Sequence, residues 1–326
     1  MSNELKGAAA VRRVVIADDH AGQRIDNFLI GQLRRVPRAL VYRILRTGQV
    51  RVNSGRIRQG YRLVEGDVVR IPPLTIPPGE ARRAPPERVR DSINHGVLRE
   101  SNGWLVLDKP SGVAVHGGSG LSFGVIEALR AARPTEHGLE LAHRLDRETS
   151  GCLLVARRRP ALRDLHAQLR EGRIKKRYLA LVRGTWSEQE QVVEAPLRRS
   201  IGAGGERVVR TDPEGKVART RFRVLAGSEA ATLVEAKPTS GRTHQIRVHA
   251  LAAGHPLAGD PKYGDRAFNR RLRESGLRRL FLHASALRFR DPDSGVMITV
   301  SAPLPAELGA VLAALGLNAG RAHDDY

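Results

Sequence analysis

A proline-rich segment divides this chain of 326 residues into two unequal parts. Proline fixes φ and has no N–H to donate, so a helix interior or a central strand cannot run through such a segment. A proline-rich tether is extended and semi-rigid. The sequence therefore predicts a small domain over residues 22–72 and a large domain over residues 94–317, joined by a linker over residues 73–93. The prolines of this segment are Pro72, Pro73, Pro77, Pro78, Pro85 and Pro86.

The small domain has the pattern of two helices followed by a small sheet. Apolar residues recur at helical spacing in Arg24–Leu33 and in Arg38–Thr47. Short alternating runs follow, and Asn53–Gly55 and Glu65–Asp67 supply residues that favour turns between them. We therefore expect a compact α and β unit here.

The small domain is also strongly basic. It holds eleven arginines and no lysine against three acidic residues, a net charge of +8 within a chain of net charge +21. Such an excess attracts polyanions, because neutralising phosphates releases counterions. A solvated helix surface usually mixes charges of both signs, which this one hardly does. We predict phosphate contact through arginines on and beside the second helix: Arg34, Arg35, Arg38, Arg43 and Arg46.

Three short strings make the small domain similar to an S4 RNA-binding domain. They are R-I-D-x-F-L at Arg24–Leu29, V-x-V-N at Val50–Asn53 and L-x-x-G-D at Leu63–Asp67. The resemblance implies that the basic helix surface binds structured RNA.

Residues 94–317 have the pattern of one larger α+β domain. Helix-like segments are Phe123–Ala132, Ala161–Arg170 and Thr243–Ala253. Because strands and helices do not alternate strictly, a mixed, mostly antiparallel sheet flanked by helices fits better than a doubly wound parallel sheet. The strand-like runs are Trp104–Leu107, Cys152–Ala156, Tyr178–Val182, Arg219–Val224, Ala231–Ala236, Phe281–Phe289 and Met297–Val300.

A dense polar string, Ala142–Gly151, leads directly into the apolar run Cys152–Ala156. Loops at the end of a sheet often carry function. Asp146 lies in this string between Arg144 and Arg147, and nearby positive charge keeps a carboxylate ionised, as a nucleophile requires. Spacing alone supports a structural salt-bridge partner equally well.

Two further segments are candidates for a site. Gly241–His249 follows a strand and opens a helix, where the N-terminus favours anions and arginine adds bidentate contacts. A basic helix cap without a ligand is the alternative. Tyr178 begins the apolar run Tyr178–Val182, and taken alone it is more typical of a core tyrosine than of a catalytic one.

Together these strings resemble the RluA-type family of RNA pseudouridine synthases. H-R-L-D-x-x-T-S-G at His143–Gly151 is long and highly specific. Three more strings match the family: G-R-T-H-Q-I-R-V-H at Gly241–His249, L-D-K-P-S-G-x-x-V-H at Leu107–His116 and L-H-A at Leu282–Ala284. The resemblance spans nearly the whole chain and is greatest to the type C branch, which implies 23S ribosomal RNA, free or in an assembly intermediate, as the partner.

The resemblance implies catalytic roles residue by residue. Asp146 would be the nucleophile, Tyr178 would pack under the flipped base and act in deprotonating C5, and Arg247 would pair with Asp146. The reaction exchanges an N1 for a C5 glycosidic bond without redox change, so it implies no metal and no organic cofactor.

Substrate contacts are implied for three more residues. Arg144 would fill the gap left by the flipped nucleotide, Leu282 would line the base pocket, and His143 would contact the substrate. Extruding a base costs a few kcal/mol, which stacking and fixed hydrogen bonds offset.

Other kinds of site and of function fit the sequence less well. Gly117–Gly120 lacks the spacing and the lysine of a phosphate-binding loop. His244, His249 and His255 do not have zinc spacing. A non-catalytic S4-type ribosomal RNA-binding or assembly protein would not need the catalytic strings, and a glycosidase or nuclease would need paired carboxylates or metal ligands.

Cellular location follows from three absences in the sequence. Cys152 is the single cysteine, residues 1–15 contain no apolar signal core, and no apolar stretch is long enough to span a bilayer. We expect a cytoplasmic protein without a membrane partner.

Overall fold

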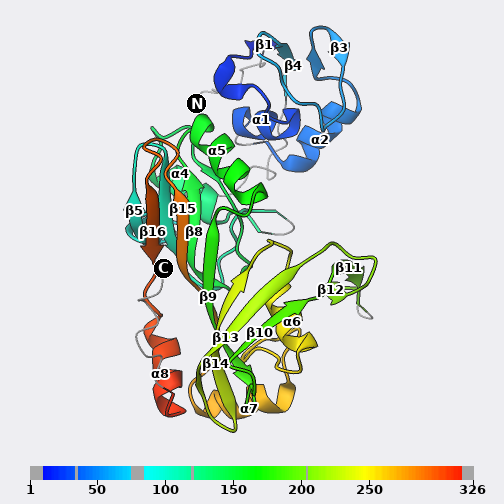
Figure 1. The fold of residues 1–326 in the computed structure, drawn as a ribbon. Coiled ribbons are helices and arrows are strands. Elements are labelled where there is room, and N and C mark those ends of the chain that lie inside the picture. The colour runs from blue at the N-terminus through cyan, green and yellow to red at the C-terminus, as the bar shows by residue number, and fades with distance from the viewer. Residues whose placement is uncertain (1–9, 34–35, 75–83, 119–120, 203–204, 318–326) are drawn as a thin grey trace, which may run out of the picture. The chain divides into compact units, whose positions relative to one another are not determined.

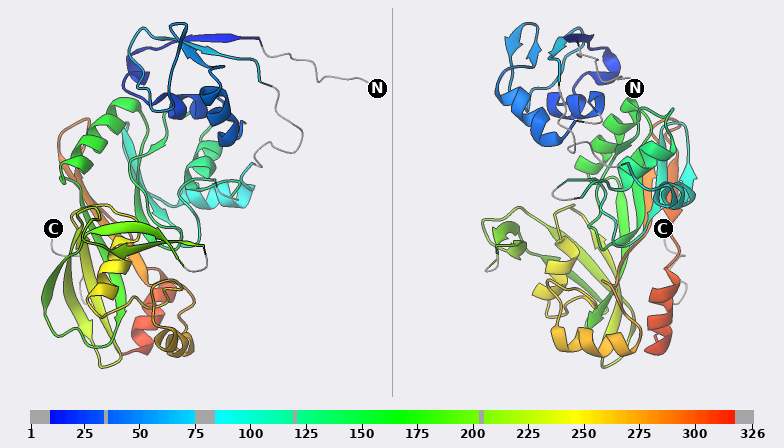
Figure 2. Two further views of the ribbon diagram at one scale, coloured as in Figure 1. Left: turned by 90° about the vertical axis from the view of Figure 1, so that its right-hand side faces the viewer. Right: turned by 180° about the vertical axis from the view of Figure 1, so that it is seen from behind.

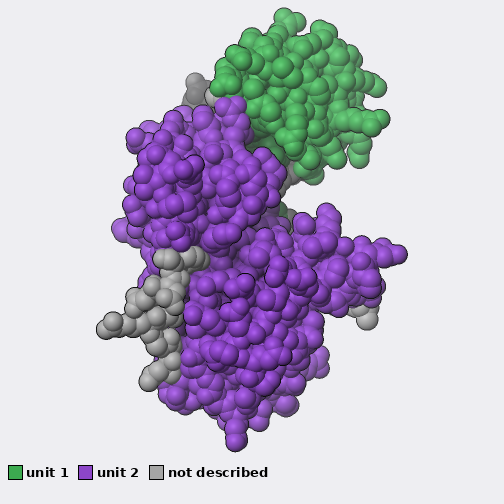
Figure 3. Space-filling model, in the orientation of Figure 1, with its two compact units in different colours: residues 1–85, 117–123 green, residues 86–116, 124–326 purple. Residues whose placement is uncertain are grey.

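The computed structural model describes residues 10–33, 36–74, 84–118, 121–202 and 205–317. Arg34, Arg35, Ser119 and Gly120 lie outside the described residues, and for Arg38 only the backbone is described. The chain forms two compact units, one of residues 1–85 and 117–123 and the other of residues 86–116 and 124–326 (Figure 3). They are called unit 1 and unit 2 below. In the described ranges, no helix is both long enough and apolar enough to span a bilayer.

Unit 1 is a small antiparallel sheet with two α-helices (Figure 1). The predicted helices are present, and the sheet also takes in residues before Gly22, because Arg12–Val15 pairs with Val68–Ile71. The strands follow the order β1-β4-β2-β3. The elements are β1 (Arg12–Val15), η1 (Asp18–His20), α1 (Ile25–Gln32), α2 (Arg38–Arg46), β2 (Arg51–Val52), β3 (Gly55–Arg56) and β4 (Val68–Ile71).

A buried carboxylate fixes the turns of unit 1. Asp67 accepts hydrogen bonds from the side chains of Asn53, at 2.8 Å, and Tyr61, at 3.0 Å, and from the backbone N–H of Val64, at 2.9 Å. Because buried polar groups need partners, this network joins the turns to the start of β4. The apolar sides of α1 and α2 pack on the sheet around Phe28.

Unit 2 is built on one large mixed sheet, as predicted (Figures 1 and 2). Its main path is β10-β13-β14-β9-β15-β8-β6-β5, with β16 paired to β15 and β7 to β8. All these pairs are antiparallel except β15 with β8. The strands are β5 (Val97–Glu100), β6 (Trp104–Lys109), β7 (Glu140–Leu141), β8 (Ser150–Ala156), β9 (Lys175–Arg183), β10 (Glu190–Glu194), β13 (Arg219–Gly227), β14 (Ala231–Pro238), β15 (Leu282–Arg290) and β16 (Met297–Ser301).

Helices and one hairpin lie on this sheet. Helix α5 packs on β8, and α6 packs on β13 and β14. A separate hairpin of β11 and β12 projects beside α6 (Figure 1). The elements are α3 (Glu87–His95), α4 (Val125–Ala132), α5 (Arg159–Arg170), β11 (Leu197–Ile201), β12 (Arg207–Thr211), α6 (Gln245–Ala252), α7 (Arg266–Glu274) and α8 (Ala306–Ala314).

Helix α3 begins inside the range predicted as linker, residues 73–93, so that range differs from the structure at its C-terminal end. Pro86 is the N-cap of the helix. Proline is tolerated at a helix start because the first N–H groups have no intrahelical partner there. Pro85 and Pro86 therefore mark where a helix begins rather than where regular structure is excluded.

The one parallel pairing explains a glycine of the sequence signature. Gly151 at the start of β8 has φ +102° and faces Ala284 of β15. A Cβ atom at Gly151 would lie 2.3 Å from the backbone oxygen of Ala284. Glycine is required for this close approach, which brings β15 beside the loop that carries Asp146.

Candidate active site

Asp146 lies in the loop of residues 142–149, which joins β7 to β8 and is called the Asp146 loop below. Its backbone closes a turn from the N–H of Thr149 to the carbonyl of Asp146, at 3.2 Å. Since β7 and β8 pair with each other, the loop projects from the end of a hairpin in the centre of the sheet. The Asp146 carboxylate therefore lies in the loop at the N-terminal end of β8, a central strand.

The last residue of β6 and the segment that follows it hold this loop by hydrogen bonds. Lys109 is fully buried, and its Nζ donates to the carbonyl oxygens of Pro110 and Val113, both at 2.8 Å, and of Arg147, at 3.0 Å. Three acceptors match the three N–H bonds of an ammonium group. Ser111 Oγ also donates to the carbonyl of Glu148, at 2.7 Å. The string L-D-K-P-S-G thus serves to anchor the Asp146 loop.

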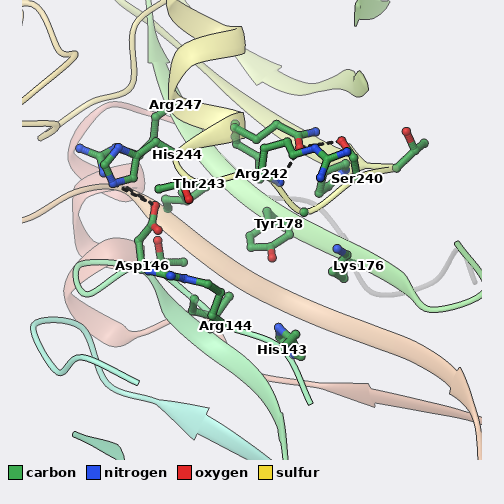
Figure 4. Close-up of a pocket in the computed structure, with 18 of the residues that line it drawn as sticks. His143, Arg144, Asp146, Lys176, Tyr178, Ser240, Arg242, Thr243, His244 and Arg247 are labelled. Atoms are coloured by element: carbon green, nitrogen blue, oxygen red, sulfur yellow. Dashed lines mark hydrogen bonds and ion pairs between the residues drawn. The ribbon is translucent and has the colours of Figure 1, made fainter. Parts of the chain in front are cut away.

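The Asp146 carboxylate is 19% exposed, and two side chains of the Gly241–His249 segment face its Oδ2 atom (Figure 4). Arg247 Nη1 lies 3.7 Å away and His244 Nε2 lies 3.9 Å away. Both distances are too long for hydrogen bonds, so the interaction is electrostatic in this state. Arg147, a neighbour in sequence, instead donates to the carbonyl of Gly112, at 2.8 Å.

Arg247 is fixed by a second carboxylate. Its Nε and Nη2 donate to the two oxygens of Asp260, at 2.7 and 2.8 Å, and Asp260 also accepts the backbone N–H groups of Lys262 and Tyr263. These hydrogen bonds, with the Arg247 charge, hold the pKa of Asp260 below its ordinary value against the opposing effect of burial. A bidentate pair of this kind sets the plane of the guanidinium and aims Nη1 at Asp146.

The pocket beside Asp146 has a volume of about 310 Å³. Tyr178 from β9 and Leu282 from β15 line it, and both side chains are almost completely buried. Arg144 and Lys176 also line it, and burial lowers the pKa of Lys176. Such a volume with an apolar floor and a few charged groups is typical of small-molecule and nucleobase sites.

His143 lines the same pocket, but one of its ring nitrogens is already engaged. Its Nε2 accepts the backbone N–H of Leu154, at 3.0 Å. Burial lowers the pKa of His143 to about 3, so its ring is neutral near pH 7. His143 therefore fixes the start of the Asp146 loop to β8.

The structure thus brings the predicted site residues of unit 2 to one pocket: His143, Arg144, Asp146, Tyr178, Arg247 and Leu282. Sequence reasoning missed the anchor Asp260 and the neighbouring Tyr263, whose ring lies under the Arg247 guanidinium at 4.8 Å. The available signal was an acid beside proline in a glycine-flanked turn, Gly259–Gly264, which is more typical of an exposed turn.

Three of the predicted arginines of unit 1, Arg38, Arg43 and Arg46, belong to α2, and the side chains of Arg43 and Arg46 are exposed. They belong to the last turn of that helix, whose apolar side is buried. Exposed guanidinium groups at a helix C-terminus are available to an anionic partner.

His244, His249 and His255 have separate partners, and His244 Nδ1 lies 2.8 Å from Tyr263 Oη. His249 hydrogen-bonds to Thr220 Oγ1, at 2.9 Å, and to the carbonyl of Ala195, at 3.0 Å. His255 stacks on Trp186. Among the described residues, no cluster of three or more His, Cys, Asp or Glu side chains has the geometry of a metal site.

Comparison with known proteins agrees with this site. The family model of RNA pseudouridylate synthases matches residues 103–252, a range that holds Asp146, Tyr178 and Arg247. The ribosomal large subunit pseudouridine synthase C of Yersinia pestis is 54% identical over 95% of this chain and 97% of its own length. The protein of the same name from Escherichia coli K12 is 54% identical over 90% of this chain and 93% of its own.

Solved structures give the same assignment for the fold. Human RNA pseudouridylate synthase domain containing 4 superimposes with a TM-score of 0.60 at 26% identity, covering 71% of this chain and 97% of that one. Human RNA pseudouridylate synthase domain containing 1 gives 0.55 at 30% identity, covering 66% and 86%. With its signature strings gathered at one pocket and this extent of identity, the chain belongs to the RluA-type family of RNA pseudouridine synthases.

Proposed function

We propose that this protein converts selected uridines of 23S ribosomal RNA to pseudouridine, with Asp146 as the nucleophile. The relatives that match over nearly their full length are named for the ribosomal large subunit, which supports large-subunit RNA as the substrate class. The net charge of +21 suits a polyanionic partner of this kind.

The observation that carries the proposal is a single carboxylate in a pocket of basic and apolar side chains. Asp146 is the one acidic residue among the described residues that line the pocket. Hydrolysis of a glycosidic bond by a pair of carboxyl groups needs a second acid about 5–10 Å away on the other side of the substrate. A single carboxylate favours a reaction in which the same group acts and is regenerated.

Isomerisation meets that requirement. The N1–C1′ bond breaks, the uracil turns while bound, C5 bonds to C1′, and the balance is one proton lost from C5 and one gained at N1. Attack on the sugar, addition to the base and promotion of a glycal all use one carboxylate and return it unchanged. Arg247, held by Asp260, lies beside that carboxylate at the start of each route.

The remaining lining residues suit a flipped base. Tyr178 and Leu282 offer an apolar floor on which a uracil stacks, and Tyr178 takes part in removing the C5 proton. Arg144, exposed at the mouth of the pocket, occupies the gap that the nucleotide leaves in the RNA. His143 contributes by shaping the loop that meets the substrate.

The test is a pseudouridine map of 23S ribosomal RNA after incubation with the wild-type protein, Asp146→Ala and Glu148→Gln. Carbodiimide labelling and primer extension read each position on an unmodified transcript. We expect new stops with wild type and with Glu148→Gln, the matched control that removes a neighbouring acid, and none with Asp146→Ala. Stops with Asp146→Ala would remove Asp146 from its role, and absence of stops with every protein would favour a non-catalytic RNA-binding function.

We also propose that unit 1 is an S4-type RNA-binding domain, joined through the proline-rich segment to the catalytic domain. Its small sheet, two helices and exposed arginines on α2 support this assignment. Arg43→Gln with Arg46→Gln should reduce the slope of log Kd against log salt by about 1.4–1.8, since each lost phosphate contact removes about 0.7–0.9. The control neutralises Arg219 and Arg221, which already pair with Glu194 and Glu190. Equal slopes for both pairs would contradict the proposal.

A further inference from the structure

His244 has a backbone conformation that its residue type rarely adopts. It is the N-cap of α6 and has φ +55°, in the left-handed region. Among the described residues of unit 2, it is the one non-glycine residue with positive φ. Such conformations cost about 1–3 kcal/mol and persist where the surroundings impose them, often at functional sites. This conformation turns the imidazole toward Asp146 (Figure 4).

The tautomer of His244 follows from its hydrogen bonds. Its Nδ1 lies 2.8 Å from Tyr263 Oη, and Tyr263 Oη accepts the backbone N–H of Val209, at 2.9 Å. Burial raises the pKa of the Tyr263 phenol above its ordinary value of 10, so the phenol keeps its proton. The Tyr263 O–H needs an acceptor, and Nδ1 is the one that lies at hydrogen-bond distance among the described residues, so we assign Tyr263 as the donor to Nδ1. The ring proton of neutral His244 is therefore on Nε2.

That Nε2–H faces the nucleophile. It lies 3.9 Å from Asp146 Oδ2, the same oxygen that Arg247 Nη1 approaches at 3.7 Å. Contacts between catalytic groups are often long without substrate and shorten in the reacting complex. Two donors converging on Oδ2 leave Oδ1 for the bond-forming step.

The surroundings keep the imidazole neutral. The side chain is about one-fifth exposed, and burial, Arg247 and Lys262 lower the pKa of His244, while Asp146 and Asp260 raise it less. A neutral Nε2–H donor orients a carboxylate without neutralising it as strongly as a second cation would. Nucleophilicity and orientation are thus both preserved.

We propose that His244 is a positioning residue for the Asp146 carboxylate, locked in its Nε2–H tautomer by Tyr263. The activity readout rests on the proposed function, whereas the tautomer does not. Because Val209 belongs to β12, the chain of contacts also connects the hairpin of β11 and β12 to the nucleophile.

The kinetic test compares His244→Phe with His244→Gln in the full-length protein. Phenylalanine removes both nitrogens, and glutamine returns an N–H near the position of Nε2. We expect kcat to fall about 10- to 100-fold in His244→Phe, with KM within about two-fold, and to recover most of that loss in His244→Gln. The matched control is His255→Phe, outside the pocket, which loses a ring nitrogen bonded at 2.9 Å to the carbonyl of Arg183.

A double-variant cycle tests the role of Tyr263. Tyr263→Phe should lower kcat about 3- to 10-fold by releasing the tautomer, and it should have little further effect in His244→Phe, because the two side chains act as one unit. Additive losses would overturn the proposed lock. Equal kcat in wild type and His244→Phe would overturn the positioning role.

Nitrogen-15 spectra of histidine-labelled protein test the tautomer without any activity. The signals of His244, assigned by their loss in His244→Gln, should show a protonated Nε2 and an unprotonated Nδ1 near pH 7. Tyr263→Phe should mix the tautomers, and Asp146→Asn should shift Nε2. A protonated Nδ1 in wild type would overturn the inference even if pseudouridine forms. If no pseudouridine forms, the proposed function fails while these spectra still decide the tautomer.

Discussion

Two loops each place a carboxylate beside Arg247, and the two carboxylates differ in burial and in hydrogen bonding. In the turn of residues 259–264, Asp260 is fully buried and accepts four hydrogen bonds, two from Arg247 and two from backbone N–H groups. In the Asp146 loop, the carboxylate is 19% exposed and meets Arg247 at 3.7 Å. The Arg247 guanidinium therefore donates two hydrogen bonds to Asp260 and none to Asp146.

This difference in hydrogen bonding distinguishes a structural carboxylate from one that is available to react. A fully buried carboxylate that already accepts four hydrogen bonds is shielded from a substrate and is costly to disturb. A carboxylate with long contacts keeps its reactivity, because hydrogen bonds to the charged form stabilise it and reduce its tendency to attack. Asp260 holds Arg247, and Arg247 then acts on Asp146 from a fixed position.

The largest effect should come from a change at Asp146, and this change should lower activity without lowering stability. Asp146→Asn removes the charge and the proposed nucleophile, so we expect at least about a 10⁴-fold loss of pseudouridine formation. Few contacts are lost, so the free energy of unfolding should change by less than about 1 kcal/mol. Chemical denaturation and single-turnover kinetics measure the two quantities. A large loss of stability would mean that Asp146 is a structural partner, like Asp260.

The next effect should fall on stability. Asp260→Asn leaves Arg247 without its carboxylate, and Arg247→Met leaves Asp260 without its cation. Each change should lower the free energy of unfolding by about 3–5 kcal/mol, because one buried charge remains uncompensated.

The double variant Arg247→Met with Asp260→Leu sharpens this comparison. It removes both charges, so it should recover most of the stability that either single change loses. It should recover no activity, since Nη1 no longer faces Asp146. Recovery of activity with stability would show that the position of Arg247 is unimportant for the chemistry.

Of these two carboxylates, the sequence predicted Asp146 and missed Asp260, and the reason is physical. Asp146 lies in a long, specific string before an apolar strand, and that pattern indicates a loop at a sheet end. Asp260 lies in Gly259–Gly264, whose glycines and proline suggest an exposed turn. What buries it is Arg247, from a helix that begins fifteen residues earlier in the chain, and no local pattern reports such a contact.

The elements of the fold divide in the same way. Those with a local sequence pattern were predicted, and those that depend on contacts far along the chain were missed. In unit 2, local patterns predicted strands β6, β8, β9, β13, β14, β15 and β16 and helices α4, α5 and α6, but not strands β5, β7, β10, β11 and β12. Helix α7 was missed because its nine residues hold just two buried apolar side chains, Phe268 and Leu272. Strand β1 was missed because Arg12–Val15 becomes a strand through its pairing with β4, far along the chain.

The smallest effect concerns how each loop responds to acid. Folding lowers the pKa of His143, at the start of the Asp146 loop, from an ordinary 6.5 to about 3. As the pH falls below 6.5, the unfolded chain takes up a proton that the folded protein refuses, so stability is lost between about pH 6.5 and pH 3. Asp260 has a pKa below its ordinary 3.8, so its contribution is present above that value and is lost at lower pH.

His143→Gln should therefore flatten the fall in stability on the acid side of pH 6.5. Glutamine offers an oxygen to the N–H of Leu154 but takes up no proton, so the slope should decrease by up to about 1.4 kcal/mol per pH unit. Denaturant unfolding from pH 7 to pH 4 measures this slope. The control is His137→Gln, which also replaces a histidine by glutamine but leaves the hydrogen bond from Leu154 to His143 intact. This variant should keep more of the wild-type slope. Parallel curves for wild type and His143→Gln would mean that His143 takes up its proton in the folded protein as readily as in the unfolded chain.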